Sequence, residues 1–127
     1  IIFTGFISNH ELFSLYKMAI ALVMPTFFGP TNIPPLEAFR IGIPVIYSDL
    51  NGLKDQIKDA ALLVDLYDPE TLSTSILKLI KDKDIRNEMI KKGYIISRKI
   101  ENIDRVNVLN EILKKYLIKY NNFRTIY

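Results

Sequence analysis

The chain has 127 residues, 49% of them hydrophobic, which is enough for one globular core and too few for two well-packed domains. It contains no cysteine and one histidine, so disulfides, cysteine metal sites and catalytic centres built on cysteine or several histidines are excluded, and we expect no bound metal. The net charge is +3, and no apolar run is as long as a membrane-spanning helix or a secretory signal requires.

The first half of the chain alternates short apolar runs with helical patterns. The runs at 1–3, 20–24, 44–47 and 61–64 are each followed by glycine, proline or polar residues, and they predict four short strands. Parallel strands that are joined by helices form an α/β, Rossmann-like sheet with helices on both faces. Ligands of such sheets bind beyond the carboxyl ends of the strands, so we look for a site there.

Three helices are expected between these strands. Ser8 and Glu11 have the spacing of a capping box, which predicts a helix that starts at the residue after Ser8. The dipeptide Pro34-Pro35 fits the first turn of a second helix, where no intrahelical N–H is needed, and Gly42 can end that helix. A shorter helical stretch is expected around 54–57.

The second half of the chain is expected to be helical. An aspartate and a proline at 68–69 predict a helix start, and apolar spacing extends that helix to about residue 81. Asp82 or Asp84 can cap the next helix, and Gly93 is expected to end it. From about Ser97 the apolar spacing predicts one or two long amphipathic helices.

Charge is distributed unevenly along the chain. Residues 78–127 hold thirteen basic and six acidic residues, against four and eight in residues 1–77. Such asymmetry can mark a surface for nucleic acid or for an anionic membrane. Lys114, Lys115 and Lys119, however, alternate with apolar residues at helical spacing, which favours a solvated helix face. We therefore expect no nucleic-acid partner, and peripheral membrane contact stays open.

The segment PTFFGPTNIPPLEA, residues 25–38, joins a strand end to a helix start. A helix N-terminus presents unpaired N–H groups and the positive end of the helix dipole, which suits an anion such as a diphosphate. Gly29 allows close approach of the backbone to a ligand, and Thr31 and Asn32 add side chains that form hydrogen bonds. A helix cap is an equally simple role for Asn32.

Glu37 and Tyr47 each have two interpretations. The Glu37 carboxylate can accept two hydrogen bonds from a vicinal diol such as a ribose, or it can be a solvated acid near a helix N-terminus. Tyr47 can line a cleft at the end of its strand, although packing with a solvated hydroxyl is the more common role of such a tyrosine.

Several short motifs occur in an order and at separations that resemble a known family. They are Thr4-Gly5-Phe6, the segment at 25–38, Gly42-Ile-Pro-Val-Ile, Asp49 with Gly52, and DAALLVD at 59–65. Over about residues 1–95 the chain resembles the C-terminal, nucleotide-sugar-binding domain of GT-B glycosyltransferases of family four.

This resemblance implies roles for individual residues. Glu37 matches the second of two family glutamates, which holds the ribose of the nucleotide. Asn32, Ile33 and Pro34 fall where the family's loop meets the diphosphate and the donor sugar. Gly29 stands where the family has its first glutamate, so the chain departs from the pattern at the position that faces the sugar. No catalytic residue is assigned.

The resemblance also implies a domain organisation and an activity. Residues 1–95 would be the donor-binding part and 96–127 a helical tail of a GT-B fragment whose acceptor-binding N-terminal domain is absent. The full-length enzyme would transfer a hexose from a nucleotide-diphospho-sugar to a glycan or lipid-linked acceptor in cell-surface polysaccharide or lipopolysaccharide synthesis. We expect retention of configuration, no cofactor or metal, and a bacterial, cytoplasmic or membrane-peripheral location. The isolated piece would be inactive and would self-associate.

Two alternatives stay open. The chain could be a non-catalytic subunit that binds a nucleotide-sugar or pairs with an active partner, which the missing first glutamate would explain. It could also come from a nucleotide-sugar epimerase of the same GT-B architecture.

Overall fold

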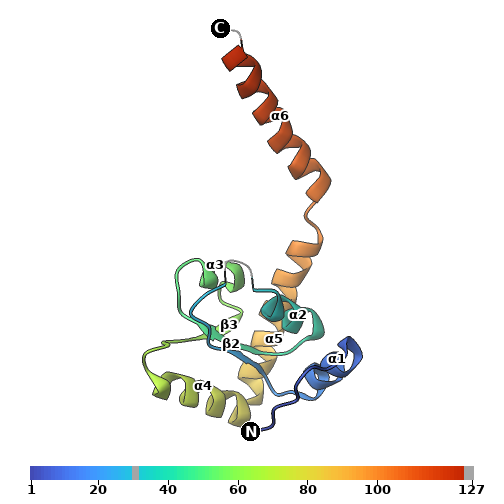
Figure 1. Cartoon of the computed structure of the whole chain (residues 1–127). Coiled ribbons are helices and arrows are strands. Elements are labelled where there is room, and N and C mark those ends of the chain that lie inside the picture. The colour runs from blue at the N-terminus through green and yellow to red at the C-terminus, as the bar shows by residue number, and fades with distance from the viewer. Residues whose placement is uncertain (30–31, 125–127) are drawn as a thin grey trace.

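The structure is a computed structural model that describes residues 1–29 and 32–124. Within these residues helices and strands alternate in the first half, and the second half is helical (Figure 1). The elements in chain order are α1 (Asn9–Met18), β1 (Leu22–Met24), α2 (Ile33–Ile41), β2 (Val45–Ser48), α3 (Leu53–Ile57), β3 (Ala61–Val64), α4 (Pro69–Lys81), α5 (Lys83–Glu101) and α6 (Arg105–Arg124).

The three strands form a parallel sheet in the order β1-β2-β3. Met24 pairs with Tyr47 and Ser48 pairs with Val64, so the three strands end at the same edge. The segments that follow β1, β2 and β3 therefore start close together, as ligand-binding segments of parallel sheets do.

Helices cover both faces of the sheet because successive side chains of a strand point to opposite faces. Tyr47 belongs to a core that includes Phe39 of α2 and Ile96 of α5. Ile46, its neighbour in β2, belongs to a second core with Leu79 of α4. The predicted α/β, Rossmann-like parallel sheet with helices on both faces is confirmed.

The predicted helix ends are largely confirmed. Ser8 caps α1 through a capping box with Glu11, and Asp68 caps α4 by accepting a hydrogen bond from the N–H of Glu70. Gly42 ends α2 in the left-handed conformation with φ of 88°, which glycine adopts without steric cost. Of the two candidate caps for α5, Asp82 is the one that the structure uses.

The prediction of a fourth strand at 1–3 is wrong. These residues adopt no strand, and Ile1, Ile2 and Phe3 are 89% or more exposed. A strand is stabilised by hydrogen bonds to a neighbouring strand, and none of the described strands lies beside residues 1–3. The apolar run alone is therefore not enough to make a strand.

Gly93 does not end a helix, contrary to expectation. It lies inside α5, where its backbone passes close to Phe39 of α2. A Cβ atom at Gly93 would lie 2.6 Å from Phe39 Cδ1, closer than packed atoms approach. The glycine allows α5 to pack tightly on α2, and α5 continues through the expected division between residues 95 and 96 to Glu101.

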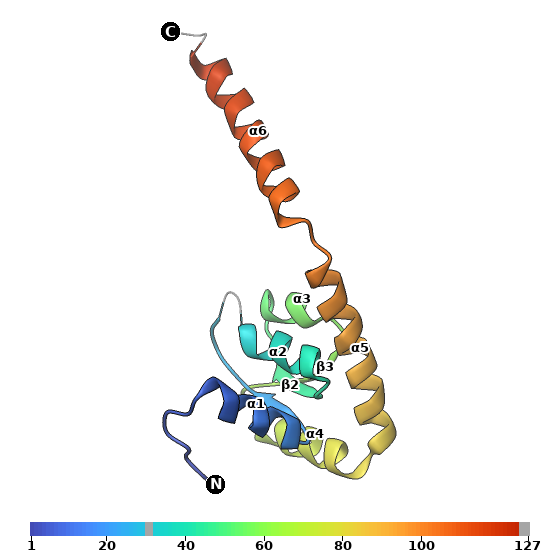
Figure 2. The ribbon, with the colours of Figure 1, turned by 90° about the vertical axis from the view of Figure 1, so that its right-hand side faces the viewer.

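The helical tail is confirmed, and α6 extends away from the body of the molecule (Figures 1 and 2). Residues 101–120 are all exposed, including the apolar side chains of α6 from Val106 to Tyr120. Among the helices in the described ranges, none combines the length and the apolar character that crossing a membrane would need.

Candidate functional site

The segment between β1 and α2 is held at its start by β2. The Ser48 hydroxyl accepts a hydrogen bond from the N–H of Thr26 and donates one to the Thr26 carbonyl, both at 2.7 Å. Ser48 is the last residue of β2 and is fully buried. Buried hydrogen bonds of this kind are strong because the surroundings are poor in water.

The same segment is held at its end by Asn32, which is 9% exposed. The Asn32 side-chain amide donates to the Tyr47 hydroxyl. The Gln56 side chain of α3 accepts from the N–H of Asn32 at 3.3 Å and donates to the Asn32 carbonyl at 2.9 Å. Asn32 occupies the N-cap position of α2, but its side chain makes no capping hydrogen bond. The helix-cap interpretation of this side chain and the solvated-hydroxyl interpretation of Tyr47 are therefore both wrong.

Gly29 and Asn32 are in close contact. Gly29 has φ of 153°, and a Cβ atom there would lie 2.7 Å from Asn32 Cγ. The position where the family has a glutamate therefore has no room for a side chain while Asn32 points inward. Thr31, the other expected polar side chain of this segment, lies outside the described residues.

The start of α2 offers fewer amides than a typical helix. Ile33, Pro34 and Pro35 are its first three residues, and proline has no N–H group. The N–H of Asn32 is donated to Gln56. Ile33 therefore carries the one amide in this first turn that can point toward an anion.

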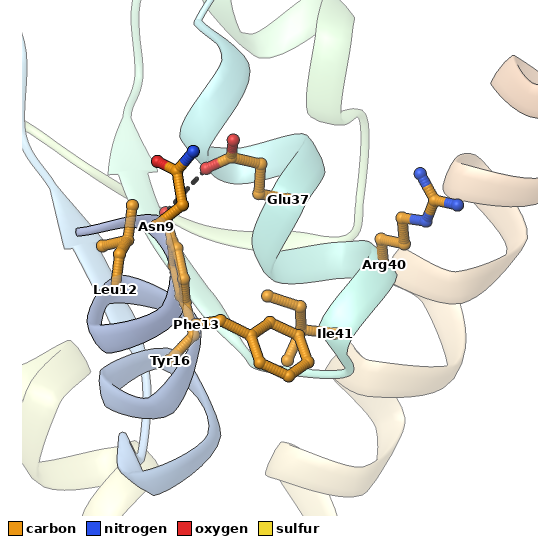
Figure 3. Close-up of a pocket in the computed structure, with 7 residues that line it drawn as sticks. All are labelled: Asn9, Leu12, Phe13, Tyr16, Glu37, Arg40 and Ile41. Carbon is orange, nitrogen blue, oxygen red and sulfur yellow. Dashed lines mark hydrogen bonds between the residues drawn. The ribbon is translucent and has the colours of Figure 1, made fainter.

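Glu37 lies in a pocket of about 330 Å³ between α1 and α2 (Figure 3). The polar groups of Asn9, Tyr16 and Glu37 gather at one end of this pocket, and Phe13 and Ile41 form an apolar wall (Figure 3). The full lining consists of Asn9, Leu12, Phe13, Tyr16, Glu37, Arg40 and Ile41. Such a pocket, mostly apolar with a few converging polar groups, suits a small organic ligand.

The Tyr16 hydroxyl donates to Glu37 Oε2 at 3.2 Å. Burial, the negative charge of Glu37 and this hydrogen bond together raise the pKa of Tyr16 to about 12, so the phenol is neutral and acts as a donor. Glu37 is the fifth residue of α2, whereas the helix dipole acts mainly within the first turn. A purely dipolar role for this acid is therefore a poor account of its position.

The expected site residues fall into two groups. Glu37 lies in the pocket between α1 and α2, whereas Gly29 lines a second hollow of about 400 Å³ with Phe27 and Phe28 of its own segment and Leu50 to Leu53 after β2. The second hollow adjoins the segment between β1 and α2, whereas the first is lined by residues of α1 and α2. The roles of Gly29, Asn32, Ile33, Pro34 and Glu37 as ligand contacts stay predictions.

Sequence reasoning placed Ser48 beside Tyr47 at the end of a strand, but it missed three other polar residues of this region. They are Asn9 and Tyr16 in the pocket and Gln56 against the β1–α2 segment. Tyr16 and Gln56 meet partners that lie 21 and 24 residues away in the chain, so no local spacing points to these contacts. Across residues 1–29 and 32–124, no three His, Cys, Asp or Glu side chains meet in a way that could hold a metal ion.

Comparison with known proteins identifies the family. Residues 1–95 match the family described as "Glycosyl transferases group 1". The chain belongs to the group 1 glycosyltransferases. Its parallel sheet and flanking helices superpose on sucrose-phosphate synthase from Thermosynechococcus elongatus, a GT-B enzyme, with a TM-score of 0.75 and 25% identity over 94% of this chain and 30% of that one.

Relatives within the group 1 glycosyltransferases include enzymes named for O-antigen synthesis. The chain is 31% identical over 91 residues to "O-antigen chain mannosyltransferase B" of Escherichia coli, which covers 72% of this chain and 24% of the relative. It is 27% identical over 89 residues to "Serotype-specific mannosyltransferase WbdA" of Escherichia coli, over 70% of this chain and 11% of the relative. The chain thus spans a quarter or less of the length of these relatives.

Proposed function

We propose that this chain supplies the donor-nucleotide side of a glycosyltransferase. The whole enzyme transfers a sugar, with mannose the first candidate, from a nucleotide-diphospho-sugar to a glycan or lipid-linked acceptor in cell-surface polysaccharide synthesis. Membership of the group 1 family and the names of the mannosyltransferase relatives support this proposal. In this proposal the enzyme works on the cytoplasmic side of the membrane, where nucleotide-sugars are made.

The position of Glu37 carries the nucleotide part of the proposal. Its carboxylate stands in a pocket beside the Tyr16 hydroxyl, and the apolar side chains of Phe13 and Ile41 form the adjoining wall. A ribose offers two hydroxyl donors to a carboxylate, and a nucleobase offers a flat apolar face to such a wall. The pocket therefore fits a nucleoside better than it fits an anion.

The diphosphate is expected on the other side of the same helix start. The Ile33 amide and the positive end of the α2 dipole lie there, at the carboxyl edge of the sheet. Neutralising the leaving nucleoside diphosphate is the main electrostatic task in glycosyl transfer. A single amide does this weakly, so basic groups from the rest of the enzyme complete the site. Transfer without a metal ion and with retention is the form that the family resemblance favours.

Binding of nucleotides to the full-length enzyme tests the proposal. Titration calorimetry with UDP, GDP and ADP should detect one of them, and Glu37→Ala should weaken its binding by about 1–3 kcal/mol because a charged acceptor for the ribose is lost. Glu70→Ala, which removes an exposed glutamate of α4, is the control and should leave the affinity unchanged. Equal affinities of wild type and Glu37→Ala would remove Glu37 from the site.

The catalytic part of the proposal needs the full-length enzyme. Release of nucleoside diphosphate from a nucleotide-sugar in the presence of a membrane extract distinguishes a transferase from a non-catalytic binding subunit. Binding without release, over a panel of UDP-, GDP- and ADP-sugars, would favour the binding subunit.

A further inference from the structure

Two side chains of the β2–α3 region each make paired hydrogen bonds with the backbone of the β1–α2 segment. Ser48 accepts from and donates to Thr26, and Gln56 accepts from and donates to Asn32. Each side chain therefore satisfies both the N–H and the carbonyl of one residue, as a neighbouring strand would. The two anchored residues flank Gly29, and Asn32 immediately precedes α2.

We infer that Ser48 and Gln56 are positioning residues that hold the backbone of Thr26 and Asn32, and with Asn32 the start of α2, in the arrangement that binds the donor. The inference rests on the proposed function and deepens it. Backbone loops lose conformational freedom when they bind a ligand, and this loss lowers affinity. Residues such as Thr26 and Asn32 that are already held in the free protein lose less, so the anchors raise affinity without contacting the nucleotide.

Burial strengthens the argument. Ser48 is fully buried, and Asn32 is 9% exposed and bonded a third time through its side chain to Tyr47. Removing the Gln56 side chain leaves the N–H and carbonyl of Asn32 without these partners in a region that is poor in water. The backbone of Asn32 is then less firmly held. The strands β1, β2 and β3 are unaffected, because the β1–β2 and β2–β3 ladders do not involve Gln56.

Amide hydrogen exchange, measured by NMR on the whole chain, tests the anchors directly. In Gln56→Ala the Asn32 amide should exchange about 5- to 30-fold faster than in wild type. In Ser48→Ala the Thr26 amide should show the same increase. In each variant the amide loses its acceptor, and the loss of one or two hydrogen bonds changes the exchange rate by about this factor. Amides of the β2–β3 ladder should keep their rates, which shows that the variants stay folded. Asp55→Ala, an exposed change one residue earlier in α3, is the matched control.

A conservative variant separates positioning from general destabilisation. Gln56→Glu keeps an oxygen that accepts from the Asn32 N–H but cannot donate to the Asn32 carbonyl, so protection of the Asn32 amide should be largely restored. The affinity for whichever of UDP, GDP and ADP binds should fall about 5- to 30-fold in Gln56→Ala, whereas Gln56→Glu is compared by amide exchange alone because its added negative charge also acts on the diphosphate.

The outcomes separate the two proposals. Unchanged exchange at Thr26 and Asn32 overturns the anchors. Faster exchange with unchanged nucleotide affinity overturns their role in donor binding. If the full-length wild-type enzyme binds none of the three nucleotides while exchange still responds, the proposed function fails and the anchors remain as backbone supports only.

Discussion

The Tyr16 hydroxyl meets the Glu37 carboxylate across the pocket between α1 and α2, and this contact has a pH dependence. Burial first, then the charge and hydrogen bond of Glu37, raise the pKa of Tyr16 from 10.0 to about 12 in the folded protein. As the pH rises, Tyr16 therefore loses its hydroxyl proton in the unfolded chain before it does so in the folded protein. The stabilising contribution of neutral Tyr16 is complete below about pH 10 and is lost as the pH rises toward 12.

An alkaline titration should show Tyr16 ionising at high pH. We expect the tyrosinate absorbance of the wild-type chain to contain a step near pH 12 that Tyr16→Phe removes. Glu37→Gln should move the step to lower pH because it removes the negative charge while the burial stays. A titration curve that is the same in wild type and Glu37→Gln would show that the two side chains do not interact in solution.

Single residues also show where sequence reasoning reached its limit. The motif at 25–38 marks Glu37 by local pattern alone, and Glu37 lies in a pocket, while its role as a ligand contact stays a prediction. The position of Asn32 indicates a helix cap, but its partners Tyr47 and Gln56 lie 15 and 24 residues away. Competition between a local cap and distant partners is decided by packing, which one position in a sequence does not reveal.

At the scale of elements, features that depend on neighbouring residues were predictable. The capping box of α1, the left-handed Gly42 and the cap at Asp68 each use bonds within a few residues, and all were confirmed. Features that depend on contact with another element were not predictable. The run at 1–3 has no strand beside it, and Gly93 serves the contact between α2 and α5.

The α2–α5 contact gives a stability prediction. Gly93→Ala places a Cβ atom 2.6 Å from Phe39 Cδ1, and Phe39 is 1% exposed, so the ring has little room to move. Overpacking of a core costs about 1–3 kcal/mol, whereas alanine in place of glycine inside a helix gains about 1 kcal/mol. Because the new Cβ atom would lie so close to a buried ring, we expect the upper part of the overpacking range, about 2–3 kcal/mol, and urea unfolding should then show a net loss of about 1–2 kcal/mol.

Two further variants separate these effects. Asn87→Ala changes an exposed residue of the same helix and reports helix propensity alone, so it should be neutral or slightly stabilising. Phe39→Leu added to Gly93→Ala should recover part of the loss, because the smaller side chain leaves space for the new methyl group. If Gly93→Ala proves as stable as wild type, α5 does not pack on α2 as closely as described.

At the scale of the whole molecule, α6 is an amphipathic helix without a partner among the described residues. At 100° per residue, Leu109, Leu113, Tyr116 and Tyr120 share one side of the helix, and each is about half or more exposed. Tyr116 and Tyr120 stack on each other with ring centres 6.4 Å apart. An exposed apolar surface of this kind favours association, since its burial would remove it from water.

We therefore expect the purified chain to self-associate through α6. Sedimentation velocity should show the mean mass rising with concentration, and Leu113→Glu should raise the dissociation constant about tenfold or more, because a leucine loses about 1.5–3 kcal/mol of burial free energy. Asn107→Glu adds the same charge on the opposite side of the helix and should leave association unchanged. Helix content from circular dichroism has to stay equal in both variants for the comparison to hold. A monomer at every concentration, or equal effects of the two substitutions, would show that the apolar side of α6 does not drive association.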